Sequence, residues 1–211
     1  MKLYYDPITV NCRKVVAGLD LIGADYDEEV LSYFGGDHKK PEFAAVNPNA
    51  EMPALTDGDM KLWESNAILV YASELTGNTE AFPLDAKVRA DITRWLLWES
   101  SKWFDACYVY LVENVVKPIL DDTCDNDRLS EHAPTFHARA AVLQAEAERA
   151  LAEVALGAGA RVLVPGCGYG HEALHLAGLG YRVVAVDFAP AAVARLRQRA
   201  AGLSLEAVEC D

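Results

Sequence analysis

The chain has 211 residues, of which 52% are hydrophobic and 24% charged, and its formal net charge is −13. This composition suits one large or two small globular domains and excludes disordered, collagen-like and disulfide-scaffold proteins. The acidic balance argues against nucleic-acid binding, which needs a basic surface. No apolar run approaches the roughly 20 residues of a membrane span, and no leader-like segment opens the sequence, so we expect no membrane partner. An odd number of cysteines without a secretion signal predicts reduced thiols in the cytoplasm.

Residues 1–78 predict an α/β domain with a mixed sheet. The expected elements are a strand at Lys2–Tyr5, a helix at Asn11–Leu21, a strand at Tyr26–Leu31, a short helix or loop at His38–Ala45, strands at Pro53–Thr56 and Met60–Trp63, and a helix at Ser65–Leu75. The run Asp57-Gly58-Asp59 predicts a hairpin between the last two strands. We expect Ser65 to be the N-cap of the last helix and Gly77 to end it.

Residues 84–155 predict an all-α domain, because apolar residues recur at helical spacing through Asp85–Leu120. An exposed acidic loop follows at 121–127, and Pro134 is expected to start a second helix, Thr135–Leu156. The loop lacks the ligand spacing of a calcium site, and we predict no metal.

From Ala160 onward the sequence alternates between strand and helix patterns. The expected elements are strands at Arg161–Pro165, Arg182–Asp187 and Leu205–Glu209, with helices at His171–Leu179 and Ala191–Ala201. This order predicts a partial Rossmann-like βαβαβ unit over 156–211, with parallel strands. The composition changes as well: all eight lysines lie at or before Lys117, and 21 of the 83 residues from Leu129 onward are alanine. The chain therefore reads as a fusion of two segments that meet within 120–155.

The loop after the first strand predicts a site for an anionic sulfur. In a thioredoxin-like order this loop brings a side chain to the N-terminus of the first helix, where the helix dipole and free N–H groups favour an anion. Thr9-Val10-Asn11-Cys12 occupies the place of a C-x-x-C pair, but its first member is a hydroxyl. A hydroxyl supports hydrogen bonding to a bound thiolate rather than dithiol exchange.

The first 117 residues resemble a glutathione S-transferase of the theta or phi kind. The matching stretches are P-I-T-V-N-C-R-K-V, G-D-H-K-K-P-E-F, N-P-N-A-E-M-P-A-L and D-G-D-M-K-L-W-E-S-N-A-I. The resemblance implies that the catalytic hydroxyl is that of Thr9, bound to the glutathione sulfur. It also implies a glutathione site made by His38, Lys39, Glu51, Met52, Pro53, Glu64 and Ser65.

Within that site the resemblance assigns His38 and Lys39 to the glycyl carboxylate. The backbone of Met52, which precedes an implied cis Pro53, is assigned to the cysteinyl part. The start of the helix at Ser65 is assigned to the γ-glutamyl carboxylate. Two positions depart from the family: Thr9 replaces a serine, and Glu51 stands where glutamine is frequent.

The same resemblance implies conjugation of glutathione to a small hydrophobic electrophile by a homodimer. Trp103, Phe104 and Tyr108 are the candidate residues for the electrophile pocket, while Trp95 and Trp98 suit an interface equally well. The S/T-x-x-D capping box that the family carries in a later helix is absent after Thr135. The alternative is therefore a non-catalytic glutathione-binding or scaffold protein.

A second motif lies in the last 55 residues. A strand leads into Gly166, Gly168 and Gly170 and then a helix, and Asp187 ends the next strand. This resembles a class I S-adenosylmethionine methyltransferase of the thiopurine methyltransferase-like group. The resemblance implies that the glycines face the methionine part, Asp187 the ribose and Asp211 the adenine. Because only three strands are present, we expect no methyl transfer and weak cofactor binding at best; the alternative is an appendage without a ligand.

Overall fold

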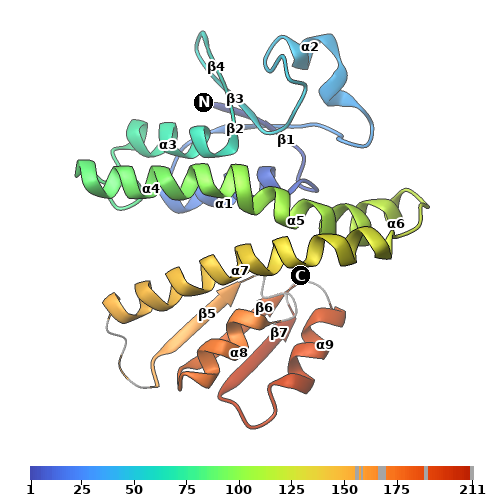
Figure 1. Ribbon diagram of the computed structural model, residues 1–211. Helices are drawn as coiled ribbons and strands as arrows, with labels where there is room; N and C mark the ends of the chain where they lie inside the picture. Colours follow the sequence, from blue (N-terminus) through green and yellow to red (C-terminus); the bar gives the residue numbers. More distant parts are fainter. Residues whose placement is uncertain (155–156, 158, 166–169, 188–189, 210–211) are drawn as a thin grey trace. The chain divides into compact units, whose positions relative to one another are not determined.

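The computed structural model describes residues 1–154, 157, 159–165, 170–187 and 190–209. The chain forms two compact units, residues 1–104 and residues 105–211 (Figure 1). Each unit is described by itself.

The first unit contains a four-stranded mixed sheet. Its strands are β1 (Lys2–Tyr5), β2 (Asp27–Val30), β3 (Ala54–Asp57) and β4 (Met60–Trp63), in the spatial order β2-β1-β3-β4. Strand β1 pairs in parallel with β2 and antiparallel with β3, and β3 pairs antiparallel with β4. The predicted hairpin is confirmed: Asp57 pairs with Met60, and Gly58 between them has a φ of 55°.

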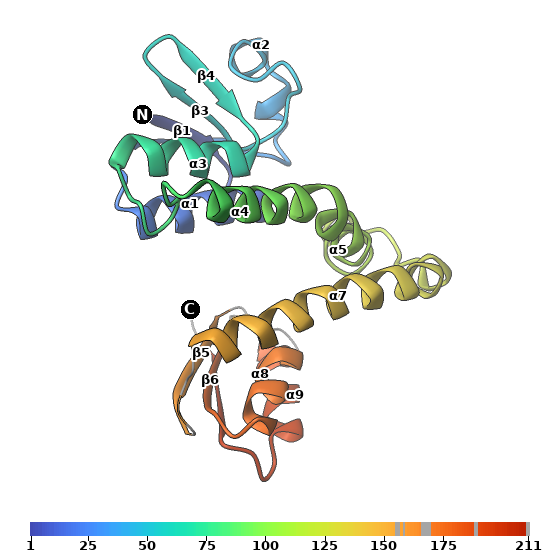
Figure 2. The ribbon, with the colours of Figure 1, turned by 60° about the vertical axis from the view of Figure 1, so that its left-hand side comes forward.

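Helices cover both faces of this sheet (Figure 2). Leu3 and Tyr5 are buried among the core side chains of α1 (Val10–Ile22) and α3 (Ser65–Thr76). Tyr4 points to the opposite face, because successive strand residues alternate. There its ring contacts Phe43 of α2 (Pro41–Ala44), edge to face, with ring centroids 6.2 Å apart. The arrangement is the expected thioredoxin-like fold.

One sequence prediction about α3 is wrong. Ser65 was expected to be the N-cap, but the N-cap is Glu64 and Ser65 is the first helical residue. Ser65 is only 7% exposed. Burial at the sheet edge draws it one position further into the helix than its capping preference suggests.

The helical stretch that was expected as one helix is interrupted by two π turns. The first unit contains α4 (Ala86–Trp98) and the π turn Glu99–Trp103. Helix α5 (Phe104–Leu111) begins at the last residue of the first unit, and the second unit continues with a π turn at Val112–Val116 and α6 (Lys117–Ile119). Asp85 caps α4: its Oδ1 accepts hydrogen bonds from the N–H groups of Lys87 and Val88, at 2.9 and 3.0 Å.

Helix α7 (Asn126–Val154) begins nine residues before the expected start at Thr135, so Pro134 lies inside it. That prediction is wrong because Asp125 is the stronger start signal. Its Oδ1 accepts from the N–H of Arg128 at 3.0 Å, and its own N–H donates to the buried carboxylate of Glu113 at 2.8 Å. Among the helices in the described residues, none combines the length and apolarity needed to cross a bilayer.

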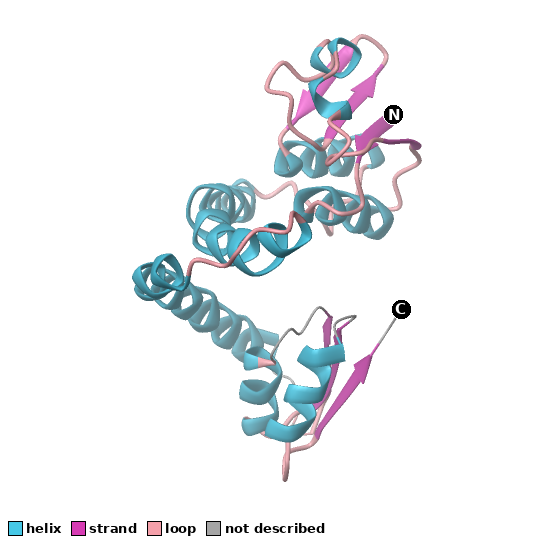
Figure 3. Ribbon diagram, turned by 90° about the vertical axis from the view of Figure 1, so that its right-hand side faces the viewer, coloured by secondary structure: helices cyan, strands magenta, loops and turns pink. Residues whose placement is uncertain are grey.

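The second unit also contains a three-stranded parallel sheet, β5 (Arg161–Pro165), β6 (Arg182–Asp187) and β7 (Leu205–Glu209), in the order β5-β6-β7. Helices α8 (His171–Gly178) and α9 (Pro190–Arg199) lie on one face of it (Figure 3). The expected βαβαβ order and the bounds of all three strands are confirmed. The core on that face is formed by small and branched apolar side chains: Ala173, Leu176, Val183, Ala185, Val193 and Leu196.

Candidate functional site

Four segments of the first unit meet at one edge of its sheet, and the strand register shows why. Tyr4 of β1 is paired with Ala54, and Ala54 is paired with Trp63. The residues just after β1, just before β3 and just after β4 therefore leave the sheet at the same edge. The loop after β2 joins them, because the N–H of Leu31 donates to the carbonyl of Tyr5 at 2.8 Å.

Thr9 lies at this edge as the N-cap of α1. Its hydroxyl donates to the carbonyl of Asp6 at 3.3 Å. The Asp6 carboxylate orders the surrounding loops by accepting from the N–H of Ile8 at 2.8 Å and the N–H of Tyr33 at 2.7 Å. Within the described residues no side chain caps α1. The first turn can therefore stabilise an anion next to the Thr9 hydroxyl.

Cys12, three residues into the same helix, is a core residue with no exposed surface. Burial raises the pKa of its thiol, and hydrogen bonds involving Thr9 and the Asp6 backbone counteract only part of that rise. A buried thiol with a raised pKa is protonated at neutral pH. The geometry therefore favours a thiolate supplied by a ligand at Thr9 over chemistry by Cys12 itself.

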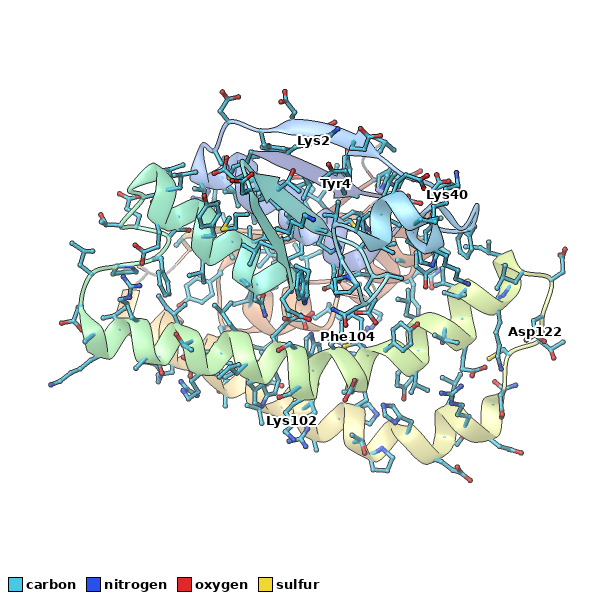
Figure 4. The ribbon with its side chains drawn as sticks, turned by 90° about the horizontal axis from the view of Figure 1, so that it is seen from above. Lys2, Tyr4, Lys40, Lys102, Phe104 and Asp122 are labelled. Carbon is cyan, nitrogen blue, oxygen red and sulfur yellow. The ribbon has the colours of Figure 1, made fainter. Side chains whose placement is uncertain are left out.

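His38 brings an unsatisfied polar atom to the same edge. The residue is 7% exposed, and its ring stacks on that of Tyr33 with centroids 4.6 Å apart and planes 9° apart. Its Nδ1 is buried without a hydrogen-bond partner in the described structure. Lys39 is exposed. Lys40, which is labelled in Figure 4, is paired with Asp37 at 2.6 Å. Buried nitrogens without a partner are rare, so this atom is a candidate contact for a ligand, and the role of His38 stays a prediction.

The peptide bond between Met52 and Pro53 is cis, as the resemblance implied. Both residues are buried, and Glu51 before them is exposed. The side-chain amide of Asn47 donates to the carbonyl of Glu51 at 2.7 Å and so fixes the entry to the bend. The backbone of Met52 is thus held at the sheet edge.

Glu64 has a φ of 71° and a ψ of 113°, a region that non-glycine residues rarely adopt. Such backbone outliers concentrate at ligand sites, because the surrounding structure has to enforce them. The outlier places Ser65 as the first residue of α3, and within the described residues no side chain caps this helix either. Two helix N-termini therefore open at the same sheet edge.

The helical part of the first unit borders an open apolar pocket of about 490 Å³. It is lined by residues from the start of α3 to the first π turn: Glu64, Asn66, Ala67, Val70, Phe82, Thr93, Leu96, Leu97 and Ser100. Trp103 is not among these residues; it stacks on Trp98 with ring centroids 6.1 Å apart. Phe104 ends the first unit, and Tyr108, in the second, is 44% exposed. Their assignment to an electrophile pocket stays a prediction.

In the second unit Gly170 and Asp187 lie at the ends of predicted elements, and their assignment to an S-adenosylmethionine site stays a prediction. Gly170 is buried, has a φ of 75° and is the N-cap of α8. Asp187 is the last residue of the middle strand β6 and is 7% exposed. Gly166, Gly168 and Asp211 lie outside the described residues. In the part of the chain that the structure describes, no three metal-binding side chains form a cluster.

The fold and this sheet edge define a thioredoxin-like domain, and comparison with known proteins places it in a family. Residues 1–74 match the model of the glutathione S-transferase N-terminal domain, and residues 126–208 match that of thiopurine S-methyltransferase. The chain is 33% identical over 131 residues to a probable glutathione S-transferase GSTF2 from Oryza sativa subsp. japonica. The match covers 62% of this chain and 61% of the rice protein, so the chain spans about three fifths of that relative's length.

Solved structures give the same result. Glutathione S-transferase III in its apo form is 31% identical, with 70% of this chain and 69% of that chain covered and a TM-score of 0.60. Glutathione S-transferase I from maize, in complex with an atrazine glutathione conjugate, is 27% identical, with 69% and 68% covered and a TM-score of 0.62. The chain belongs to the glutathione S-transferase family through its N-terminal part, and its C-terminal part is similar to thiopurine S-methyltransferase.

Sequence reasoning missed three polar residues next to this site. Lys14 of α1, Asn66 of α3 and Glu99 at the first π turn form one hydrogen-bonded set. Asn66 lies 52 residues and Glu99 85 residues after Lys14 in the chain, and no local motif connects the three. Only the packing of the helices shows that they meet.

Proposed function

We propose that this protein binds glutathione at the sheet edge of its first unit and conjugates it, through its sulfur, to small hydrophobic electrophiles. The observation that carries the proposal is the convergence of Thr9, the buried His38 and the start of α3 at that edge. None of these features alone identifies a ligand. Together they offer one hydroxyl and two anion-binding positions, which suits a tripeptide thiol with a carboxylate at each end.

In the proposed complex the peptide lies across the edge. The γ-glutamyl carboxylate accepts hydrogen bonds from Ser65 and the first turn of α3. The cysteinyl backbone pairs with Met52 in the manner of an added strand. The glycyl carboxylate accepts from His38 Nδ1, which gives that buried atom its missing partner, and Lys39 adds a positive charge. Glu51 and Glu64, both exposed, border the bound peptide.

The proposed chemistry is thiolate stabilisation followed by substitution. The Thr9 hydroxyl turns from the Asp6 carbonyl to donate to the sulfur, and together with the α1 dipole it lowers the pKa of the bound thiol. The thiol proton leaves to solvent. With an aryl halide as electrophile, the thiolate forms the new C–S bond, the carbon–halogen bond breaks, and halide departs with the electron pair.

A threonine series tests this role. Thr9→Ala removes the donor and is expected to lower kcat/KM with an activated aryl halide by about a hundredfold, with little change in the Kd for glutathione. Thr9→Ser keeps the hydroxyl and is expected to stay within a few fold of the unaltered protein. The measurements are steady-state conjugation rates and calorimetric titration with glutathione. Unchanged turnover in Thr9→Ala would remove Thr9 from the mechanism.

The electrophile is proposed to be small and apolar, and the active form to be a homodimer. One structural relative was solved in complex with an atrazine glutathione conjugate. The alternative, a glutathione-binding protein without catalysis, is separated by the same two measurements: binding without turnover in the unaltered protein supports it.

A second candidate function is S-adenosylmethionine binding by the second unit. It is favoured by the match of residues 126–208 to thiopurine S-methyltransferase and by the position of Asp187 at the end of the middle strand. A carboxylate there suits the two ribose hydroxyls. Calorimetry with S-adenosylmethionine tests it against Asp187→Asn. Absence of heat with the unaltered protein would reject the second candidate.

A further inference from the structure

Lys14, Asn66 and Glu99 form a polar set that joins three elements of the first unit. Lys14 Nζ donates to Asn66 Oδ1 at 3.1 Å and pairs with Glu99 Oε2 at 2.9 Å. Asn66 Nδ2 donates to the same Glu99 oxygen at 2.9 Å. The side chains of Lys14 and Glu99 are 28% and 30% exposed. The three contacts form a closed triangle, so each side chain is fixed by the other two.

Asn66 also bonds to the backbone of α4. Its Nδ2 donates to the carbonyl of Leu96 at 2.8 Å, and Ser100 Oγ donates to the same carbonyl at 3.1 Å. The π turn begins directly afterwards, at Glu99. Helices depart from regular α geometry where an outside group enters their hydrogen-bond ladder. The π turn and the Asn66 contact are therefore parts of one arrangement that holds α3 against α4.

The position of this set relative to the glutathione site gives it a function. Lys14 lies in the helix that Thr9 caps, and Asn66 directly follows Ser65. The set therefore connects the element that places the hydroxyl to the element that receives the γ-glutamyl carboxylate. The Lys14 and Glu99 charges have opposite signs, so removing one leaves the other to act on a bound thiolate through space.

We infer that Lys14, Asn66 and Glu99 are positioning residues that hold the two helix N-termini in register and balance the charge beside the bound sulfur. The inference rests on the proposed function. None of the three residues needs to touch glutathione. They act through Thr9 and Ser65, and through the field of the Lys14–Glu99 pair.

Two variants test the inference, one that removes the positive charge of Lys14 and one that removes the negative charge of Glu99. Their readout is the pKa of bound glutathione, which a loss of structure alone would not shift in opposite directions. Lys14→Met and Glu99→Gln break the same contact, but they leave a negative and a positive charge respectively. We expect Lys14→Met to raise the pKa of bound glutathione by roughly half a pH unit and Glu99→Gln to lower it by a similar amount. Both variants are expected to raise the Kd for glutathione about three- to tenfold.

The measurements are the ultraviolet thiolate absorbance of the glutathione complex as a function of pH and calorimetric titration with glutathione. The matched control is Lys2→Met, which removes an ion pair of similar length, 2.8 Å to Glu29, at the other end of β1. It is expected to change neither quantity. The remaining charged or titratable groups of the site are the same in all three variants: Asp6, Cys12, His38, Lys39, Glu51 and Glu64.

The outcomes separate the two levels of the proposal. If the unaltered protein does not bind glutathione, both the proposed function and this inference fail. If it binds and the two variants shift the thiol pKa in the same direction, or not at all, only the inference fails. If Lys14→Met does not fold, Glu99→Gln, which keeps the shape of the side chain, decides alone: a downward shift supports the inference and no shift overturns it.

Discussion

The starts of α3 and α8 present the same backbone feature for different reasons. Each helix follows an N-cap residue with positive φ: 71° at Glu64 and 75° at Gly170. At Gly170 packing explains the residue, because an added Cβ would lie 2.2 Å from Leu196 Cδ1. At Glu64 the residue is exposed and carries a side chain in a region that disfavours one. The backbone outlier at Glu64 fits the proposed glutathione site, because such outliers concentrate at ligand sites.

Adding a side chain at Gly170 is expected to cause the largest loss of stability among the predicted variants. Gly170→Ala adds a methyl group against the buried Leu196 and forces alanine to a positive φ, so it is expected to destabilise the second unit by about 2–4 kcal/mol. Gly178→Ala is the matched control in the same helix, where an added Cβ meets nothing within 4 Å. Chemical denaturation followed by circular dichroism measures both. Equal stability of the two variants would contradict the packing explanation.

Glu113 differs from Glu64 in that its carboxylate is buried and fully paired, whereas Glu64 is exposed. Glu113 has no exposed surface and accepts from Lys117 at 2.7 Å, the N–H of Asp125 at 2.8 Å and Arg128 at 2.9 Å. The Lys117 hydrogen bond, followed by the Asp125 N–H and then Arg128, holds the pKa of Glu113 below its usual 4.5.

A carboxyl whose pKa is lowered by folding stabilises the folded state above the unfolded-state pKa, and this stability is lost as the pH falls through the folded-state value. We therefore expect the Tm to fall on acidification below about pH 4.5, and Glu113→Gln to have a lower Tm at pH 7 and a shallower acid dependence. Scanning calorimetry from pH 7 to pH 3 measures this, with the exposed Glu131→Gln as control. Parallel pH curves for Glu113→Gln and the unaltered protein would contradict the expectation.

The smallest expected change in stability is at Glu64, and it is a stabilisation rather than a loss. Glu64→Gly relieves the positive φ and is expected to change stability by no more than about 1 kcal/mol, in the stabilising direction. If the strained backbone serves the ligand, the same variant weakens glutathione binding by a few fold, because glycine no longer fixes the start of α3. Thermal denaturation and calorimetric titration give the two values. A stabilised variant with unchanged affinity would show that the outlier has no role in binding.

Local patterns in the sequence predicted most of the elements. The bounds of β1, β4, β5, β6 and β7 agree with the expected strands, because alternation and turn residues act over a few neighbouring positions. Two of the errors, Ser65 as N-cap and Pro134 as a helix start, share a cause. Each local preference was outweighed by a contact from elsewhere: burial at the sheet edge for Ser65, and the Asp125 cap with its bond to Glu113 for Pro134.

The sequence by itself determined the order of the strands and helices, since these follow from periodicity and from turn residues that act over a few neighbouring positions. The residues of the proposed glutathione site came from contiguous motifs that resemble those of glutathione S-transferases. Only the tertiary structure decided that the first unit joins α1, α3 and α4 through Lys14, Asn66 and Glu99. It also revealed the unpartnered nitrogen of His38 and the backbone outlier at Glu64. Hydrogen bonds between residues tens of positions apart depend on how helices pack, and no local pattern carries that information.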